Sequence, residues 1–105
     1  GALPARAEAE AIRRRVLSAM ANEGARLVGS GAALRPSDID AALFLAMGFP
    51  RWQGGPMHWA DTEGLMVLRR DLRLWAEEAP ELWGVAPLID QLIGMGLHFS
   101  DMNAG

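Results

Sequence analysis

Residues 48–57, with the sequence GFPRWQGGPM, constrain the fold of this chain more than any other stretch. Three glycines and two prolines so close together cannot lie inside a helix or a strand. Phe49, Trp52 and Met57 are nevertheless too apolar for a simple solvated linker. We interpret the stretch as a loop that folds back onto the core between two helices, and a loop that contacts a ligand is the alternative.

Proline and glycine also divide the rest of the chain into short helices. Pro36, Pro56 and Pro87 each stand at a first helical position, where the missing N–H would be unpaired in any case. No stretch alternates apolar and polar residues as a strand would. The predicted fold is therefore all-α, with about five helices in one small bundle that forms a single domain over residues 1–105. The helices are expected over residues 6–30, 36–47, 56–63, 65–79 and 87–95, after a disordered lead at residues 1–5.

Composition limits the classes of function. The net charge of −3 argues against a nucleic-acid partner, because a phosphate-binding surface normally has a basic excess. No apolar run approaches the roughly 20 residues of a membrane span, and the N-terminus has no apolar region typical of a signal peptide. The absence of cysteine excludes disulfides and thiolate chemistry. We therefore expect a cytoplasmic protein that binds neither nucleic acid nor membrane.

The first predicted helix has an apolar stripe that we expect to be buried. Its members recur at steps of four and seven residues, and they are Ile12, Val16, Met20 and Leu27. Glu23 falls on the same stripe, and a buried carboxylate needs hydrogen-bond donors. We expect Glu23 to accept hydrogen bonds from backbone N–H groups of residues 48–57 or from the Trp52 indole. Such bonds would hold the loop in place.

Two other charged groups are poor candidates for chemistry. Asp38 and Asp40 lie two residues apart on a helix, so their side chains point about 200° apart and cannot share a proton or a metal. Negative charge at a helix start explains both. Arg13, Arg14 and Arg15 also face different directions, which indicates a solvated helix side or a protein contact rather than an anion clamp.

His58 and His98 are the only imidazoles. His58 could meet Asp61 on one helix face, but no serine stands in an activating turn and no further ligands complete a zinc site. Gly54 and Gly55 lead into a helix N-terminus, which can bind phosphate, but no strand or lysine accompanies them. We predict no catalytic, cofactor-binding or metal-binding residue. A small enzyme that uses His58 and Asp61 is the least favoured alternative.

The order of the motifs along the chain resembles a known family. The motifs are Asn22-Glu23, Asp38-Ile39-Asp40, Gly48-Phe49-Pro50, Gly54-Gly55-Pro56-Met57, and Asp61 with Gly64. Over roughly residues 10–99 they resemble the C-terminal domain of the L-3-hydroxyacyl-CoA dehydrogenases, in particular its second, last copy in the multifunctional fatty-acid β-oxidation enzymes. The resemblance implies an orthogonal bundle like the C-terminal domain of 6-phosphogluconate dehydrogenase. We expect structural roles for Glu23, Phe49, Pro50, Trp52, Gly54, Gly55, Pro56 and Asp61.

The resemblance also implies where the chemistry lies. Members of the family oxidise 3-hydroxyacyl-CoA with NAD, which is held by a preceding Rossmann domain that also carries the catalytic His-Glu pair. This chain has no glycine fingerprint for a dinucleotide, so we expect no cofactor in it. The catalytically engaged copy supplies an Asn followed by Arg, and these positions fall on Arg14 and Arg15, so the Asn is missing. Gln53 stands where close relatives have a basic residue.

These expectations combine into one functional hypothesis. The chain is expected to be a structural, dimerisation-type domain of an NAD-dependent 3-hydroxyacyl-CoA dehydrogenase of fatty-acid β-oxidation, with or without a fused enoyl-CoA hydratase. It would support an active site in other segments. Its implied partners are the Rossmann domain and the first helical copy, and in isolation it would self-associate. The alternative is a free-standing helical module that binds a protein partner.

Overall fold

The computed structural model describes residues 2–32, 34–47 and 54–103. Within these ranges the chain is helical and contains no strand, which confirms the prediction of an all-α domain. None of the helices in this part of the chain is long and apolar enough to cross a membrane. The elements are α1 (Ala2–Gly29), α2 (Pro36–Met47), α3 (Gly55–Glu63), α4 (Leu65–Ala76), α5 (Pro80–Trp83), α6 (Pro87–Met95) and the 3-10 helix η2 (Phe99–Asn103).

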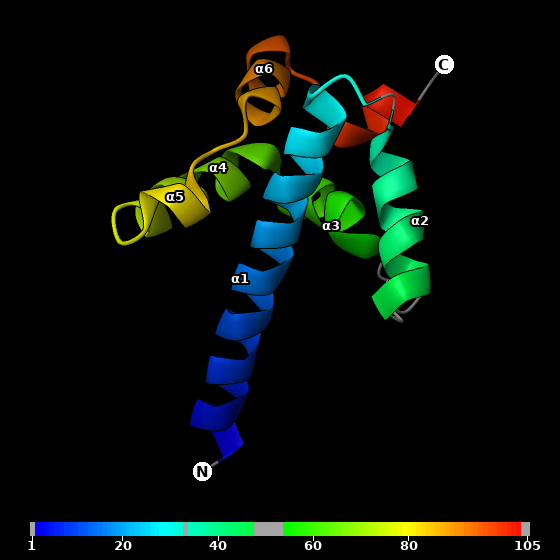
Figure 1. The fold of residues 1–105 in the computed structure, drawn as a ribbon. Helices are drawn as coiled ribbons and strands as arrows, with labels where there is room; N and C mark the ends of the chain where they lie inside the picture. Colours follow the sequence, from blue (N-terminus) through cyan, green and yellow to red (C-terminus); the bar gives the residue numbers. More distant parts are fainter. Residues whose placement is uncertain (1, 33, 48–53, 104–105) are drawn as a thin grey trace.

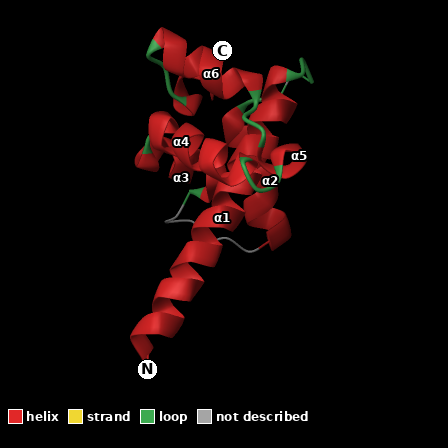
Figure 2. Ribbon diagram, turned by 90° about the vertical axis from the view of Figure 1, so that its left-hand side faces the viewer, coloured by secondary structure: helices red, strands yellow, loops and turns green. Residues whose placement is uncertain are grey.

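Helix α1 is the longest element and projects out of the bundle. Its 28 residues span about 42 Å, and the molecule extends 49 Å along its longest axis and 32 and 23 Å along the others. Figures 1 and 2 show the N-terminal half of α1 standing clear of the other helices, and residues 5–13 are all exposed. The helix begins at Ala2 rather than near Arg6. Pro4 is compatible with this start because it lies in the first turn, where no backbone hydrogen bond is lost.

The second half of α1 packs closely on α3 through small side chains. Ala21 and Ala25 are fully buried, and Gly24 lies between them in sequence. A Cβ atom on Gly24 would lie only 2.7 Å from Sδ of Met57, so no larger side chain fits without movement. Small residues on α1 therefore let the two helix backbones approach each other. The larger core side chains come from the other elements and include Met57, Leu68, Leu72, Ile89, Leu92 and Phe99.

The prediction of the buried face of α1 is wrong. Ile12, Val16 and Leu27 are 63%, 45% and 49% exposed. The face that packs inward is about 140° away around the helix and consists of Leu17, Ala21, Ala25 and Val28. Helix α1 thus has apolar residues on two opposite faces, and the face with the smaller side chains is the one that contacts the bundle. We call the exposed stripe of Ile12, Val16 and Leu27 the α1 outer face.

Two short elements were not predicted. No helix was expected between residues 79 and 87, but Pro80 begins α5, which brings Trp83 to within 4.9 Å of Trp75 between ring centroids. The 3-10 helix η2 follows α6 and buries Phe99. The expected loop residues Phe49, Pro50 and Trp52 lie outside the described residues, as does Gln53.

Candidate functional site

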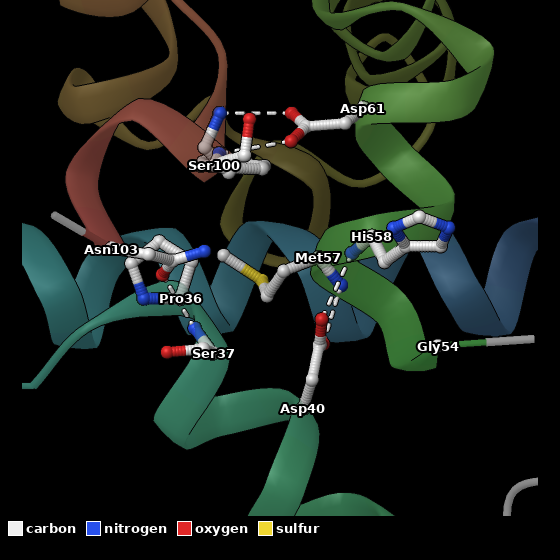
Figure 3. Close-up of a pocket in the computed structure, with 10 residues that line it drawn as sticks. Pro36, Ser37, Asp40, Gly54, Met57, His58, Asp61, Ser100 and Asn103 are labelled. Carbon is white, nitrogen blue, oxygen red and sulfur yellow. Dashed lines mark hydrogen bonds between the residues drawn. The ribbon is translucent and has the colours of Figure 1, made fainter. Parts of the chain in front are cut away.

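A pocket of about 270 Å³ lies where α2, α3 and η2 meet. Helices α2 and α3 follow each other in sequence, whereas η2 lies near the end of the described chain, and Figure 3 shows that labelled residues of all three elements line one space. The lining of the pocket includes His58 and Asp61, which the sequence analysis placed on one helix face. Its lining consists of Pro36, Ser37, Asp40, Gly54, Met57, His58, Asp61, Phe99, Ser100 and Asn103.

Asp40 of α2 holds the start of α3. Its carboxylate accepts hydrogen bonds from the backbone N–H groups of Met57, at 2.8 Å, and His58, at 3.0 Å (Figure 3). A helix start normally has such an acceptor on its own N-cap residue, but the N-cap here is Gly54, which has no side chain. Asp40 therefore supplies in space the cap that the local sequence lacks.

Gly54 and Gly55 make this arrangement possible. Their φ angles are +74° and +85°, in the left-handed region that glycine adopts readily. A Cβ atom on Gly55 would lie 2.7 Å from Oδ1 of Asp40, and one on Gly54 would lie 2.5 Å from Cδ2 of His58. The two glycines thus turn the chain into α3 and leave room for the carboxylate and the imidazole.

The same contacts show that a phosphate does not fit at this helix start. The N–H groups of Met57 and His58 already donate to the carboxylate of Asp40. An incoming phosphate would therefore meet a negative group rather than unoccupied donors. No strand is present among the described residues to build a dinucleotide fold around it. The start of α3 is therefore closed to the phosphate group that Gly54 and Gly55 suggested.

Asp40 and Asp38 differ in their acid–base behaviour. Burial raises the pKa of Asp40 above its ordinary value, and this effect outweighs the hydrogen bonds from Met57 and His58, which lower it. The pKa of Asp38 is instead lowered, first by a hydrogen bond from the backbone N–H of Arg35 at 2.8 Å and then by the Arg35 side chain. Asp38 thus has the expected helix-start role, while Asp40 connects two helices.

Asp61 repeats this capping role at the opposite side of the pocket. Its two carboxylate oxygens accept hydrogen bonds from the backbone N–H groups of Phe99, at 2.8 Å, and Ser100, at 2.9 Å (Figure 3). Both oxygens of Asp61 are therefore engaged by η2, and the ring of His58 packs against Gly54. This arrangement gives His58 and Asp61 structural surroundings rather than those of a general base and its orienting group.

Glu23 does not have the environment that we predicted. Its side chain is 66% exposed and pairs with Arg26, so the expectation that Glu23 lies on the buried face is wrong. Its expected partners at residues 48–53 lie outside the described residues, and at residues 57–58 the carboxylate that accepts the backbone N–H groups belongs to Asp40. The error follows from choosing the wrong apolar face of α1.

Asn22 was missed by the sequence reasoning, although it stands next to Glu23. It is 1% exposed, its Nδ2 donates to the carbonyl of Gly84 at 2.8 Å, and its Oδ1 accepts from the N–H of Ala86 at 2.9 Å. One amide side chain thus holds two backbone groups of the segment between α5 and α6, and Arg26 donates a further hydrogen bond to the Gly84 carbonyl. The Asn-Glu motif contained this signal, but the deep position of its first residue depends on the packed face of α1.

Arg14 and Arg15 are also structural. Arg14 donates to Glu63 at 2.5 Å and to Asp71 at 3.0 Å, which joins α1 to α3 and α4 and raises the pKa of Arg14. The Arg15 guanidinium lies 4.8 Å from the ring centroid of Trp75 and 5.8 Å from that of Trp83. The three successive arginines do face different ways, and two of them contact the bundle while their side chains stay 35% and 43% exposed.

The geometry favours an architectural function over catalysis. Every carboxylate of the pocket accepts backbone N–H groups of a neighbouring element. No group of three His, Asp or Glu side chains that could hold a metal occurs in the part of the chain that the structure describes. The pocket therefore acts as the joint that fixes α2, α3 and η2.

Comparison with known proteins gives one family and several relatives. The family whose model matches is described as 3-hydroxyacyl-CoA dehydrogenase, C-terminal domain, and the match covers residues 12–98. The peroxisomal bifunctional enzyme of Danio rerio is 34% identical over 98 residues, which are 91% of this chain and 14% of the relative. The human enzyme of the same name is 34% identical over 76 residues, which are 72% of this chain and 10% of the relative.

A plant relative extends the comparison. The peroxisomal fatty acid beta-oxidation multifunctional protein of Oryza sativa subsp. japonica is 32% identical over 83 residues, which are 79% of this chain and 11% of the relative. The chain thus spans only 10–14% of the length of these three relatives. All three are peroxisomal enzymes by name, so the expectation of a cytoplasmic protein is wrong.

Proposed function

The chain belongs to the family of C-terminal domains of 3-hydroxyacyl-CoA dehydrogenases, and we propose on that premise that it supports an active site built by other segments of such an enzyme. The parent enzyme would oxidise 3-hydroxyacyl-CoA with NAD in fatty-acid β-oxidation. The relatives support this proposal because two are bifunctional enzymes and one is a fatty acid beta-oxidation multifunctional protein. The free-standing interaction module loses support for the same reason.

The observation that carries the proposal is the α1 outer face. Ile12, Val16 and Leu27 expose 63%, 45% and 49% of their surface along a helix whose N-terminal half stands clear of the bundle (Figure 1). Ile12 and Val16 lie one turn apart, and Leu27 lies about three turns further along the same side of α1. Exposed large apolar side chains on one side of a helix indicate a surface that another element covers. We propose that the Rossmann domain and the first helical copy of the parent supply this cover.

NAD is assigned to the parent and not to this chain. The cofactor accepts a hydride from the 3-hydroxyl carbon when it is bound in such an enzyme. In this chain the helix start that could have met its pyrophosphate is closed by Asp40. The contribution of the described residues is to hold α1, α2 and α3 in fixed positions, which would fix the α1 outer face for docking.

The proposal is tested by activity in two settings. The isolated chain, mixed with acetoacetyl-CoA and NADH, should neither bind these compounds nor oxidise NADH. In the full-length enzyme, Ile12→Asp with Val16→Asp should lower kcat or dissociate the domains, because charges would replace the apolar contact. Leu45→Asp, at an 81% exposed site on α2, is the matched control and should leave activity unchanged. Turnover by the isolated chain would contradict the proposal.

A further inference from the structure

The first half of α1 has no tertiary support from the helices that the structure describes. Residues 5–13 are all exposed, and Figures 1 and 2 show this part of the helix clear of the bundle. Among the described residues, no side chain of residues 5–13 takes part in a hydrogen bond, an ion pair or a ring contact. The backbone hydrogen bonds of the helix itself are therefore what maintains its conformation here.

Contacts with the bundle begin at Arg14 and Arg15. The two guanidinium groups leave α1 in different directions, because successive residues of a helix are about 100° apart. Arg14 reaches α3 and α4, and Arg15 reaches α4 and α5, where their partners are Glu63, Asp71, Trp75 and Trp83. Leu17, at 3% exposure, is the first buried side chain after residue 5. The two arginines thus mark the point at which α1 becomes part of the packed domain.

A cavity of about 360 Å³ lies between α3 and the part of α1 that precedes this point. Its lining consists of Glu10, Ala11, Arg13, Arg14, Trp59 and Glu63. A water molecule takes up roughly 30 Å³ in the liquid, so this space holds solvent rather than packed side chains. Helix α3 therefore gives residues 10–13 little support.

The sequence of the projecting part favours a helix but does not stabilise its start. Residues 5–13 are mainly Ala, Glu and Arg, which are good helix formers. The first turn of α1, however, contains no acidic residue that would interact favourably with the helix dipole. A helical segment of about 12 residues is marginal in water without tertiary contacts. Residues 2–13 therefore depend on a packing partner for full order.

We propose that residues 2–13 form a conditional helix, which frays in the isolated chain and becomes fully ordered when the rest of the parent enzyme covers the α1 outer face. The identity of this cover rests on the proposed function. Val16 and Leu27 lie on the half of α1 that the bundle holds, so they make the first contact, and Ile12 joins the interface as the conditional helix orders. Because ordering costs conformational entropy, docking is weaker than docking on a preformed helix would be.

Hydrogen–deuterium exchange followed by mass spectrometry tests the inference on the 105-residue chain. At submicromolar concentration, which keeps the chain monomeric, the amides of residues 5–13 should exchange at least about tenfold faster than those of residues 17–28, after correction for their unfolded-chain rates. In the full-length enzyme the exchange of residues 5–13 should slow by at least about tenfold, because the cover orders them.

Two matched double variants locate the boundary. Arg14→Ala with Arg15→Ala removes the contacts with α3, α4 and α5, and it should raise the exchange of residues 14–20 at least about fivefold while that of α6 stays unchanged. Arg6→Ala with Arg13→Ala removes two exposed arginines of α1 and should leave residues 14–20 unchanged.

Three results would overturn the inference. They are equal exchange of residues 5–13 and 17–28 in the isolated wild-type chain, equal effects of the two double variants, and fast exchange of residues 5–13 in the full-length enzyme. The first two leave the proposed function intact, because they concern the isolated chain alone. Turnover by the isolated chain would instead contradict the proposed function, and it would leave the exchange pattern of that chain as expected here.

Discussion

At the scale of single residues, Asp40 and Asp38 show how position decides the role of one side-chain type. Both lie in the first turns of α2, two residues apart. Asp38 accepts from Arg35 just before its own helix, whereas Asp40 accepts from Met57 and His58 at the start of another helix. Asp38 closes a local turn, and Asp40 closes a tertiary contact.

Removal of the Asp40 carboxylate should therefore destabilise the domain. Asp40→Ala leaves two N–H groups at the start of α3 without their acceptor, and we expect a loss of about 1–2 kcal/mol in the free energy of unfolding. Asp40→Asn retains one acceptor and should lose roughly half as much. Urea denaturation measures both. A loss in Asp40→Ala no larger than that in Leu45→Ala, at an exposed position of the same helix, would contradict this role.

The pKa directions give a second prediction. Because the pKa of Asp40 is raised in the folded chain, its contribution to stability is fully present below its unfolded pKa of about 4 and is lost as the pH rises through the folded pKa. The free energy of unfolding of the wild type, relative to that of Asp40→Asn, should thus be lower at about pH 7 than at about pH 3.5. Asp38 has a lowered pKa, so Asp38→Asn should show the opposite trend. Urea titrations at both pH values provide the check.

Asn22 and Glu23 give a third prediction, on neighbouring positions. Asn22→Leu should cost about 1–2 kcal/mol of unfolding free energy, because the N–H of Ala86 loses its partner and the carbonyl of Gly84 keeps only its hydrogen bond from Arg26. Glu23→Leu and Glu23→Gln should each change stability by less than about 0.5 kcal/mol, because the pair with Arg26 is largely exposed. Thermal melts compare the three variants. If Glu23→Leu lowered the melting temperature as much as Asn22→Leu does, Glu23 would be the buried hydrogen-bonding residue that the sequence analysis expected.

At the scale of elements, α1 shows which part of the fold the sequence can predict. Its helical character, and that of α2, α3, α4 and α6, follows from proline and glycine positions and from apolar spacing. The packed face of α1 does not follow, because apolar residues lie on both sides and periodicity favours the side with larger residues. Packing instead selects the side where Ala21, Gly24 and Ala25 allow a close approach to α3.

The joint of α2, α3 and η2 could be predicted only in part. The sequence motifs contain Asp40, Gly54, Gly55 and Asp61. However, the backbone partner of Asp40 lies 17 residues away in sequence, and that of Asp61 lies 38 residues away. A local rule assigns a cap to the nearest helix start, whereas here each cap crosses to another element. Helix α5 was missed for a related reason, since Pro80 is compatible with both the end of one helix and the start of the next.

The contact between α1 and α3 gives a fourth prediction. Gly24→Ala adds a methyl group 2.7 Å from Sδ of Met57, which is buried, and should lower stability by about 1 kcal/mol despite the better helix propensity of alanine. Gly94→Ala in α6 is the control, because a Cβ there meets nothing within 4 Å. It should raise stability by about 0.5–1 kcal/mol. Chemical denaturation that ranks the two variants in the reverse order would exclude the close approach.

At the scale of the whole molecule, the domain combines a rigid joint with an exposed docking helix. The joint fixes α2, α3 and η2 through Asp40 and Asp61, while the N-terminal half of α1 extends away from them (Figure 2). The chain also spans only 10–14% of three relatives that are much longer. These features agree with a domain that acts as a support within a larger enzyme.

Sedimentation of the isolated chain shows whether the α1 outer face is a docking surface. An uncovered α1 outer face should find a second copy, so the wild-type chain should self-associate above roughly micromolar concentration. Ile12→Asp with Val16→Asp should sediment as a monomer, and Leu45→Asp, at another exposed apolar site, should associate like the wild type. A wild-type chain that stays monomeric well above micromolar concentration, or association that the α1 variant leaves unchanged, would contradict the role of this face.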